Sequence, residues 1–219
     1  GGYDILFALP GASLTLQDGR LQGVGADAPT PDFLQALNRW HQREANSQPN
    51  PYNLPFCGGW FLYLGYELAQ QIEPCLNLPP ARQHLPTALA VRCPAALVRE
   101  RRSRRVYAVA ETSTLMDELL RELDNAPEYI PATLPHVSVT EDDPKHYLRH
   151  IQAVQDYILA GDIFQVNLSR EWRARLADPV APHALYAALR QANPAPFAGL
   201  MCWQDTAVIS SSPERLLSL

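Results

Sequence analysis

One carboxylate of this chain stands where the backbone could give it chemistry to perform. Glu214 follows a predicted strand, residues 207–212, in the run Ser210-Ser211-Ser212-Pro213-Glu214-Arg215. Because Pro213 has no backbone N–H, pairing of that strand should break just before Glu214. A carboxyl group kept protonated at such a break can act as a general acid. An ordinary glutamate at a strand end is the other interpretation of the same pattern.

A second candidate surface follows Gly161, where a helical pattern ends. Gly161 can take the left-handed conformation that closes a helix. From Ile163 to Arg170 polar and apolar residues alternate, which predicts a strand that places the polar side chains Gln165, Asn167 and Ser169 on one face. That face could meet solvent, or it could form a polar floor under a ligand.

Metal and thiol chemistry finds little support. His146 and His150 lie one helical turn apart, but neither has a third ligand nearby in sequence, so an exposed polar face is the better interpretation. The cysteines are too widely spaced for a zinc pattern, and we interpret them as reduced thiols of a cytoplasmic protein. They are Cys57, Cys75, Cys93 and Cys202.

The glycines of residues 56–67 could belong to a phosphate-binding loop or to a kinked core strand. No GxGxxG order is present and no lysine follows, so the kinked strand is favoured. The net charge of −5 and the pI of about 5.7 argue against nucleic acid as a partner. The basic run Arg99–Arg105 therefore predicts a solvated hairpin tip.

No apolar run reaches the roughly 18 residues that a membrane span needs, which predicts a protein without a membrane partner. The pattern predicts an α+β fold in three parts: residues 1–126, a proline-rich linker at 127–142, and residues 143–219. Helices are predicted at 31–46, capped by Thr30, and at 113–123, 144–160 and 178–192. Strands are predicted at 3–9, 13–17, 21–24, 56–67, 87–92, 97–110, 163–170, 197–203 and 207–212. The helix after Asp143 should bury the stripe Tyr147, Ile151, Val154 and Ile158.

Four motifs, in this order, resemble one family, the chorismate-utilising enzymes that form component I of anthranilate and aminodeoxychorismate synthases. The motifs are Phe56-Cys57-Gly58-Gly59 with Leu64-Gly65-Tyr66-Glu67, then Gly161-Asp162-Ile163-Phe164-Gln165-Val166-Asn167-Leu168, Ala195-Pro196-Phe197, and Ser212-Pro213-Glu214-Arg215. The resemblance extends from Tyr3 to Leu217. It implies largely antiparallel sheets with helices packed outside, an N-terminal region at 1–126, and the start of a chorismate-binding catalytic domain at 143–219.

The resemblance also implies a reaction. Asn167, where anthranilate synthases usually carry valine, favours the aminodeoxychorismate branch. In that branch ammonia from a glutamine amidotransferase subunit replaces the 4-hydroxyl of chorismate, and Mg²⁺ holds the carboxylates. By position, Glu214 matches the glutamate that protonates the departing hydroxyl. The family's nucleophilic lysine and its magnesium ligands would lie beyond Leu219, so we expect both ends to be cut, no metal ligand within these residues, and an incomplete catalytic site.

Pro196 and Phe197 match a segment that lines a tryptophan pocket in family members, and Tyr3 falls near its other wall. A further segment of that pocket would precede Gly1, and Ala198 is small, so its occupancy stays open. Two alternatives remain beside the aminodeoxychorismate branch: anthranilate synthase component I, and an inactive module that binds tryptophan or docks a partner.

Overall fold

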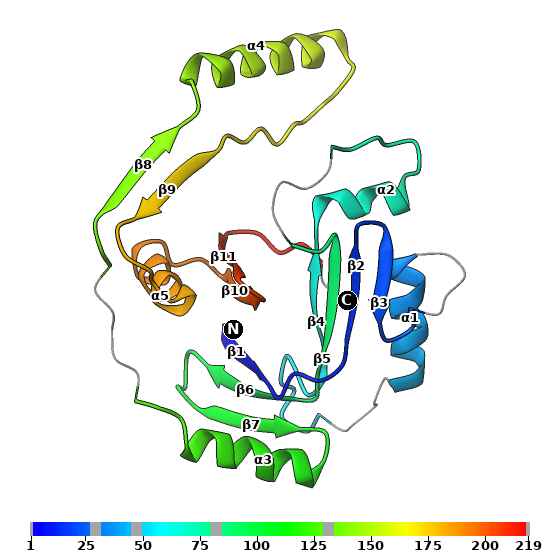
Figure 1. Ribbon diagram of the computed structural model, residues 1–219, viewed down its shortest axis with the longest axis vertical. Coiled ribbons are helices and arrows are strands. Elements are labelled where there is room, and N and C mark those ends of the chain that lie inside the picture. The colour runs from blue at the N-terminus through cyan, green and yellow to red at the C-terminus, as the bar shows by residue number, and fades with distance from the viewer. Residues whose placement is uncertain (1, 27–31, 45–49, 80–84, 129–133, 218–219) are drawn as a thin grey trace. The chain divides into compact units, whose positions relative to one another are not determined.

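The chain folds into two compact units, and the computed structural model describes residues 2–26, 32–44, 50–79, 85–128 and 134–217. The first unit holds residues 1–129 with 203–206, and the second holds 130–202 with 207–219. The division after residue 129 falls inside the predicted linker. Figure 1 labels the elements of each unit, which are described separately below.

The first unit contains a four-stranded antiparallel sheet covered by one helix. Its strands lie in the order β3-β2-β5-β4. Their bounds are β2 Ser13–Gln17, β3 Arg20–Gly23, β4 Gly59–Leu64 and β5 Ala88–Cys93, and the helix is α1, Phe33–Glu44. The short helices η1 (Tyr66–Leu68) and α2 (Ala69–Ile72) follow β4. The predicted hairpin at 13–24 is confirmed. The core strand predicted at 56–67 is confirmed only in part: residues 59–64 form β4 at the edge of the sheet, with Leu62 and Leu64 exposed, and residues 66–68 belong to η1.

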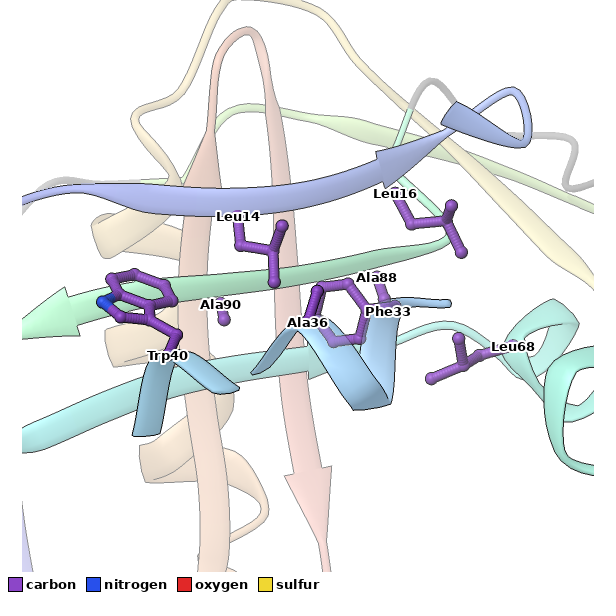
Figure 2. Packing of buried hydrophobic residues seen from close by; sticks show 8 residues of the cluster. All are labelled: Leu14, Leu16, Phe33, Ala36, Trp40, Leu68, Ala88 and Ala90. Atoms are coloured by element: carbon purple, nitrogen blue, oxygen red, sulfur yellow. The ribbon is translucent and has the colours of Figure 1, made fainter. Parts of the chain in front are cut away.

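The core of this unit forms where α1 meets the sheet, as Figure 2 shows. Phe33, Ala36 and Trp40 recur at helical spacing and are fully buried against the sheet. Leu14 and Leu16 of β2 supply the facing side chains. The predicted start of the helix at Thr30 and Pro31 lies outside the described residues. In the described part, an Asp32 carboxylate oxygen accepts a hydrogen bond from the Gln35 amide at 2.9 Å, which is N-cap geometry.

The first unit also contains a three-stranded antiparallel sheet, β1-β6-β7. Its strands are β1 Tyr3–Ala8, β6 Ala95–Glu100 and β7 Val106–Ala110, and α3, Ser113–Asp124, packs on β6 and β7. The hydroxyl of Thr112 caps α3 by accepting from the Leu115 amide at 3.2 Å. The basic run lies at the exposed turn between β6 and β7, as predicted.

The second unit has helices α4 and α5 and two pairs of strands. The elements are β8 Val137–Glu141, α4 Pro144–Ala160, β9 Trp172–Leu176, α5 Pro182–Ala192, β10 Phe197–Trp203 and β11 Thr206–Ser212. Asp143 caps α4 by accepting from the Lys145 amide at 3.0 Å, and Gly161 closes it in the left-handed conformation at φ 80°. The predicted start and end of this helix are confirmed. The predicted α+β class, with antiparallel sheets and helices packed outside, is confirmed as well.

Four predictions for this unit are wrong in detail. The helix predicted at 178–192 begins only at Pro182. Residues 163–170 form no strand; the strand begins at Trp172, because the alternating segment has no ladder partner among the described residues. Residues 137–141 of the predicted linker form β8, which pairs with β9. The stripe along α4 is only half-buried at Tyr147, Ile151 and Val154, and Ile158 is exposed. Within the described ranges, no helix is long and apolar enough to cross a membrane.

Candidate functional site

Glu214 lies two residues beyond the end of β11. The strand ends at Ser212, where the position of Pro213 predicted that pairing would break. The Ser212 hydroxyl donates to the Glu214 carbonyl at 3.1 Å and accepts from the Glu214 amide at 3.4 Å. These two bonds fix the backbone of the turn. Glu214 itself is exposed, so the partial burial expected of a general acid is not present in these residues alone.

Two of the predicted site segments meet beside that turn. The Arg215 guanidinium lies over the ring of Phe197, with Cζ 5.4 Å from the ring centroid. Ser211 donates from its hydroxyl to the Asn193 carbonyl at 2.7 Å, which ties the end of β11 to the end of α5. The structure therefore brings Pro196-Phe197 and Glu214-Arg215 together at one end of the β10–β11 hairpin.

Tyr3, the third residue predicted for the tryptophan pocket, belongs to the first unit. It packs against an apolar cluster centred on Ala96 and Val98 of β6. Pro196 and Phe197 belong to the second unit and are exposed, Phe197 by 39%. Tyr3 therefore packs in the core of the first unit.

The segment after Gly161 presents its polar and apolar side chains to solvent. Gln165 and Asn167 are exposed, and Phe164 is 93% exposed. Arg170 anchors the far end of this segment: its guanidinium pairs with Glu141 at 3.0 Å and lies 4.6 Å from the ring centroid of Trp172. The alternation pattern did not reveal this anchor, although an arginine beside an aromatic residue hints at it.

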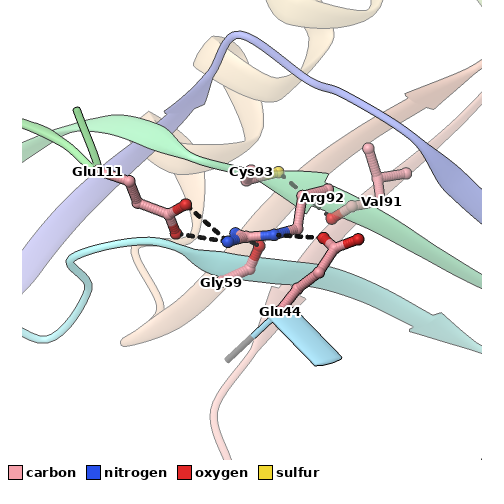
Figure 3. A network of polar contacts seen from close by, with 6 residues as sticks. All are labelled: Glu44, Gly59, Val91, Arg92, Cys93 and Glu111. Atoms are coloured by element: carbon pink, nitrogen blue, oxygen red, sulfur yellow. Dashed lines mark hydrogen bonds and ion pairs between the residues drawn. The ribbon is translucent and has the colours of Figure 1, made fainter. Parts of the chain in front are cut away.

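A second polar cluster, in the first unit, was missed from the sequence. Arg92 lies on β5 among apolar residues, and its guanidinium donates to both carboxylate oxygens of Glu111 at 2.7 and 2.6 Å (Figure 3). It also donates to the Gly59 carbonyl at 2.8 Å and lies 4.4 Å from the ring centroid of Trp60. The sequence did hold one signal of this cluster, an arginine inside the apolar strand Ala88–Cys93.

This cluster shapes its surroundings. Gly58 has φ 118°, a conformation that favours glycine, and a Cβ there would clash with the Glu111 side chain, which would have to move away from Arg92. Beside Arg92, burial raises the pKa of the Cys93 thiol, whose Sγ lies 3.6 Å from the Val91 carbonyl oxygen. The guanidinium of Arg92 is paired with Glu111, and the neighbouring thiol is buried. Both features indicate a structural cluster that joins β5, β4 and the end of β7.

No group of three metal-ligating side chains exists in the part of the chain that the structure describes. The rings of His146 and His150 contact each other with centroids 4.2 Å apart, but no third ligand joins them there. The described residues therefore do not fit the Mg²⁺ ion that the resemblance implies.

The fold and the order of the motifs define the class of protein. Residues 5–219 match the chorismate binding enzyme family, and the chain belongs to that family. It is 32% identical over 214 residues to anthranilate synthase component 1 of Thermus thermophilus, covering 92% of this chain and 45% of that protein. It is 28% identical over 227 residues to aminodeoxychorismate synthase component 1 of Klebsiella aerogenes, covering 99% of this chain and 48% of that protein.

The structure resembles the crystal structure of anthranilate synthase component I from Streptococcus pneumoniae TIGR4. The TM-score is 0.76 at 20% sequence identity, and the match covers 98% of this chain and 51% of that one. This likeness establishes the fold. The chain spans less than half the length of these two curated relatives.

Proposed function

We propose that this chain is the N-terminal portion of aminodeoxychorismate synthase component I. The complete enzyme would aminate chorismate at C4, with ammonia from a glutamine amidotransferase partner, to give 4-amino-4-deoxychorismate for p-aminobenzoate and folate synthesis. Membership of the chorismate binding enzyme family is the observation that carries this proposal. Asn167 supports the aminodeoxychorismate branch through the resemblance described above.

In this proposal Glu214 has the role of general acid. Its carboxyl group gives a proton to the 4-hydroxyl of chorismate, which leaves as water, and the nitrogen of ammonia takes its place at C4 with loss of one proton. A carboxylic acid holds its proton near neutral pH only when it is shielded from water. Since Glu214 is exposed in this chain, substrate or further protein must cover it during the reaction.

Tryptophan is proposed as a second ligand, stacked on the ring of Phe197 beside Pro196. The partly exposed ring of Phe197 supports an aromatic subsite there, and tryptophan would take the place of the Arg215 guanidinium that lies over the ring. Mg²⁺ is proposed as the cofactor of the complete enzyme, where it would bind the carboxylates of chorismate. No residue of the described chain is assigned to it.

A product assay separates the two branches of the family. The full-length gene product is incubated with chorismate, ammonium and Mg²⁺, and its products are separated by chromatography. 4-Amino-4-deoxychorismate, recognised by its conversion to p-aminobenzoate with a lyase, is the expected product.

Anthranilate synthase component I is the second candidate, because the 32% identical relative carries that name. Release of anthranilate, which is detected by its fluorescence, would replace the proposal with this candidate. A folded sample that forms neither product but gives heat on titration with tryptophan would indicate a binding module.

A further inference from the structure

The segment that carries Glu214 has no strand pairing to hold it. Residues 213–217 follow β11 and belong to no helix or strand (Figure 1). Pro213 has no backbone N–H, so it cannot continue the pairing of β11 with β10. A general acid must nevertheless lie within hydrogen-bond distance of the oxygen that it protonates. Other contacts must therefore fix the backbone of Glu214.

One hydroxyl group makes these contacts. Ser212 Oγ accepts a hydrogen bond from the Glu214 amide at 3.4 Å and donates one to the Glu214 carbonyl at 3.1 Å. A hydroxyl group can do both because it has one proton to donate and two lone pairs to accept. Among the described residues, the backbone of Glu214 forms no other hydrogen bond. Ser212 therefore closes this turn without a partner strand.

The residues on both sides of the turn are held as well. The Ser211 hydroxyl donates to the Asn193 carbonyl at 2.7 Å, which ties the end of β11 to the end of α5. On the other side, the Arg215 guanidinium lies over the ring of Phe197, with Cζ 5.4 Å from the ring centroid. The backbone at Glu214 thus lies between two anchored residues.

The carboxylate of Glu214 is the part of this turn that stays available to a substrate. It is exposed, and it forms no hydrogen bond or ion pair with any residue that the structure describes. A fixed backbone below an unengaged carboxyl group suits a proton donor, because misplacing a catalytic group by about 1 Å can lower a rate roughly 10²-fold.

We infer that Ser212 is a positioning residue for Glu214. Its hydroxyl group holds the Glu214 backbone so that the carboxyl group reaches the 4-hydroxyl of chorismate. The inference rests on the proposed function, in which Glu214 is the general acid. Without the Ser212 hydroxyl, the Glu214 backbone gains rotational freedom, and its carboxyl group spends less time at the departing oxygen.

Two substitutions of Ser212 isolate the hydroxyl group. The side chains introduced by Ser212→Thr and Ser212→Val have nearly the same shape, and only the first keeps the oxygen. Rates are measured on the full-length enzyme with chorismate, Mg²⁺ and saturating ammonium chloride. For Ser212→Val, kcat should fall at least tenfold while KM for chorismate stays within threefold. For Ser212→Thr, kcat should stay within threefold of the wild type.

A double-mutant cycle shows whether Ser212 acts through Glu214. In a Glu214→Gln background, Ser212→Val should lower the residual kcat less than twofold, because the proton donor is already lost. A tenfold loss in that background would show that Ser212 acts independently of Glu214, and it would overturn the inference.

Ser103→Val is the matched control. Ser103 Oγ accepts from the Arg105 amide, two residues later, at 3.2 Å, so this exposed turn of the first unit holds the same kind of bond. Its loss should leave kcat within twofold of the wild type. Circular dichroism compares the thermal midpoints of the variants. A similar shift in both valine variants, with loss of kcat in Ser212→Val alone, supports positioning over a purely structural role.

Equal kcat values for Ser212→Val and Ser212→Thr would overturn the inference. The proposed function would stand if Glu214→Gln still lowers kcat. Where Ser212→Val does not fold, Ser212→Ala removes the hydroxyl group without added bulk and is compared with the wild type in the same way. A wild-type enzyme that does not aminate chorismate overturns the proposed function, and the inference with it.

Discussion

The guanidinium of Arg215 lies over the ring of Phe197, with 5.4 Å between Cζ and the ring centroid. These residues come from two different predicted sites, the aromatic subsite and the turn that carries Glu214. Because Glu214 precedes Arg215 directly, a ligand that takes the face of Phe197 must displace the guanidinium next to the proposed general acid. The two sites are therefore physically linked at the end of the β10–β11 hairpin.

Replacing the proposed acid should remove proton transfer without unfolding the chain. In the full-length enzyme, Glu214→Gln should lower kcat for amination about 10²-fold to 10⁴-fold, the usual contribution of a general acid. The exposed position predicts little change in thermal midpoint. Steady-state kinetics and circular dichroism measure both quantities, and Glu73→Gln, at an exposed site after α2, is the control. A kcat within threefold of the wild type would remove Glu214 from the mechanism.

The Arg215 contact predicts the order of tryptophan affinities. Phe197→Ala should abolish the heat of tryptophan binding, because the stacking surface is lost. Arg215→Gln should bind tryptophan more tightly than the wild type, since the ligand no longer competes with the guanidinium for the ring. Calorimetry at constant pH compares the three proteins. Equal affinity in all three would place tryptophan elsewhere or exclude it.

Local signals predicted most elements of this fold. Asp143, Pro144 and Gly161 set the ends of α4 because caps and breakers act within one helical turn. Strand β8 could not be predicted in this way, since Val137–Glu141 lies among prolines and pairs with residues 172–176, far along the chain. Residues 163–170 show the converse: their alternation suits a strand, but a strand also needs a partner.

The candidate site also has one feature that the local sequence predicts and others that it does not. Pro213 predicted where β11 ends, because a missing N–H acts locally. The contact between Phe197 and Arg215, and the ion pair of Arg92 and Glu111, depend on how segments far apart in the chain come together. No periodic pattern in the sequence predicts contacts between segments that lie so far apart.

Two glycines with positive φ allow a matched comparison. Gly161→Ala should cost about 1–2 kcal/mol, the backbone penalty alone, because nothing lies within 4 Å of the added Cβ. Gly58→Ala should cost more, since its Cβ would lie 2.1 Å from Glu111 Oε1 and force the carboxylate away from Arg92. Urea unfolding of the two variants measures both costs. Equal costs would show that Glu111 moves aside without loss.

The ion pair of Arg92 and Glu111 should be worth more than an exposed pair. Both side chains are largely buried, with 11% and 13% exposed. Arg92→Ala should lower the free energy of unfolding by about 3–5 kcal/mol, because it strands a buried carboxylate and removes the guanidinium from Trp60. Arg173→Ala, which breaks exposed pairs with Glu171 and Asp142, should cost less than about 1 kcal/mol. Chemical denaturation of the two variants should show this difference.

The buried thiol of Cys93 should make the chain less stable in alkali. Burial raises the pKa of Cys93, so the folded state holds its proton to a higher pH than the unfolded state does. The resulting stabilisation is complete below the unfolded pKa of roughly 8.5 and is lost as pH rises through the folded value. The free energy of unfolding, measured by urea titration between pH 7 and pH 10, should therefore fall more steeply in the wild type than in Cys93→Ala. Cys75→Ala, which removes an exposed thiol, should keep the wild-type slope, and a wild-type slope in Cys93→Ala would show that Cys93 does not cause the loss.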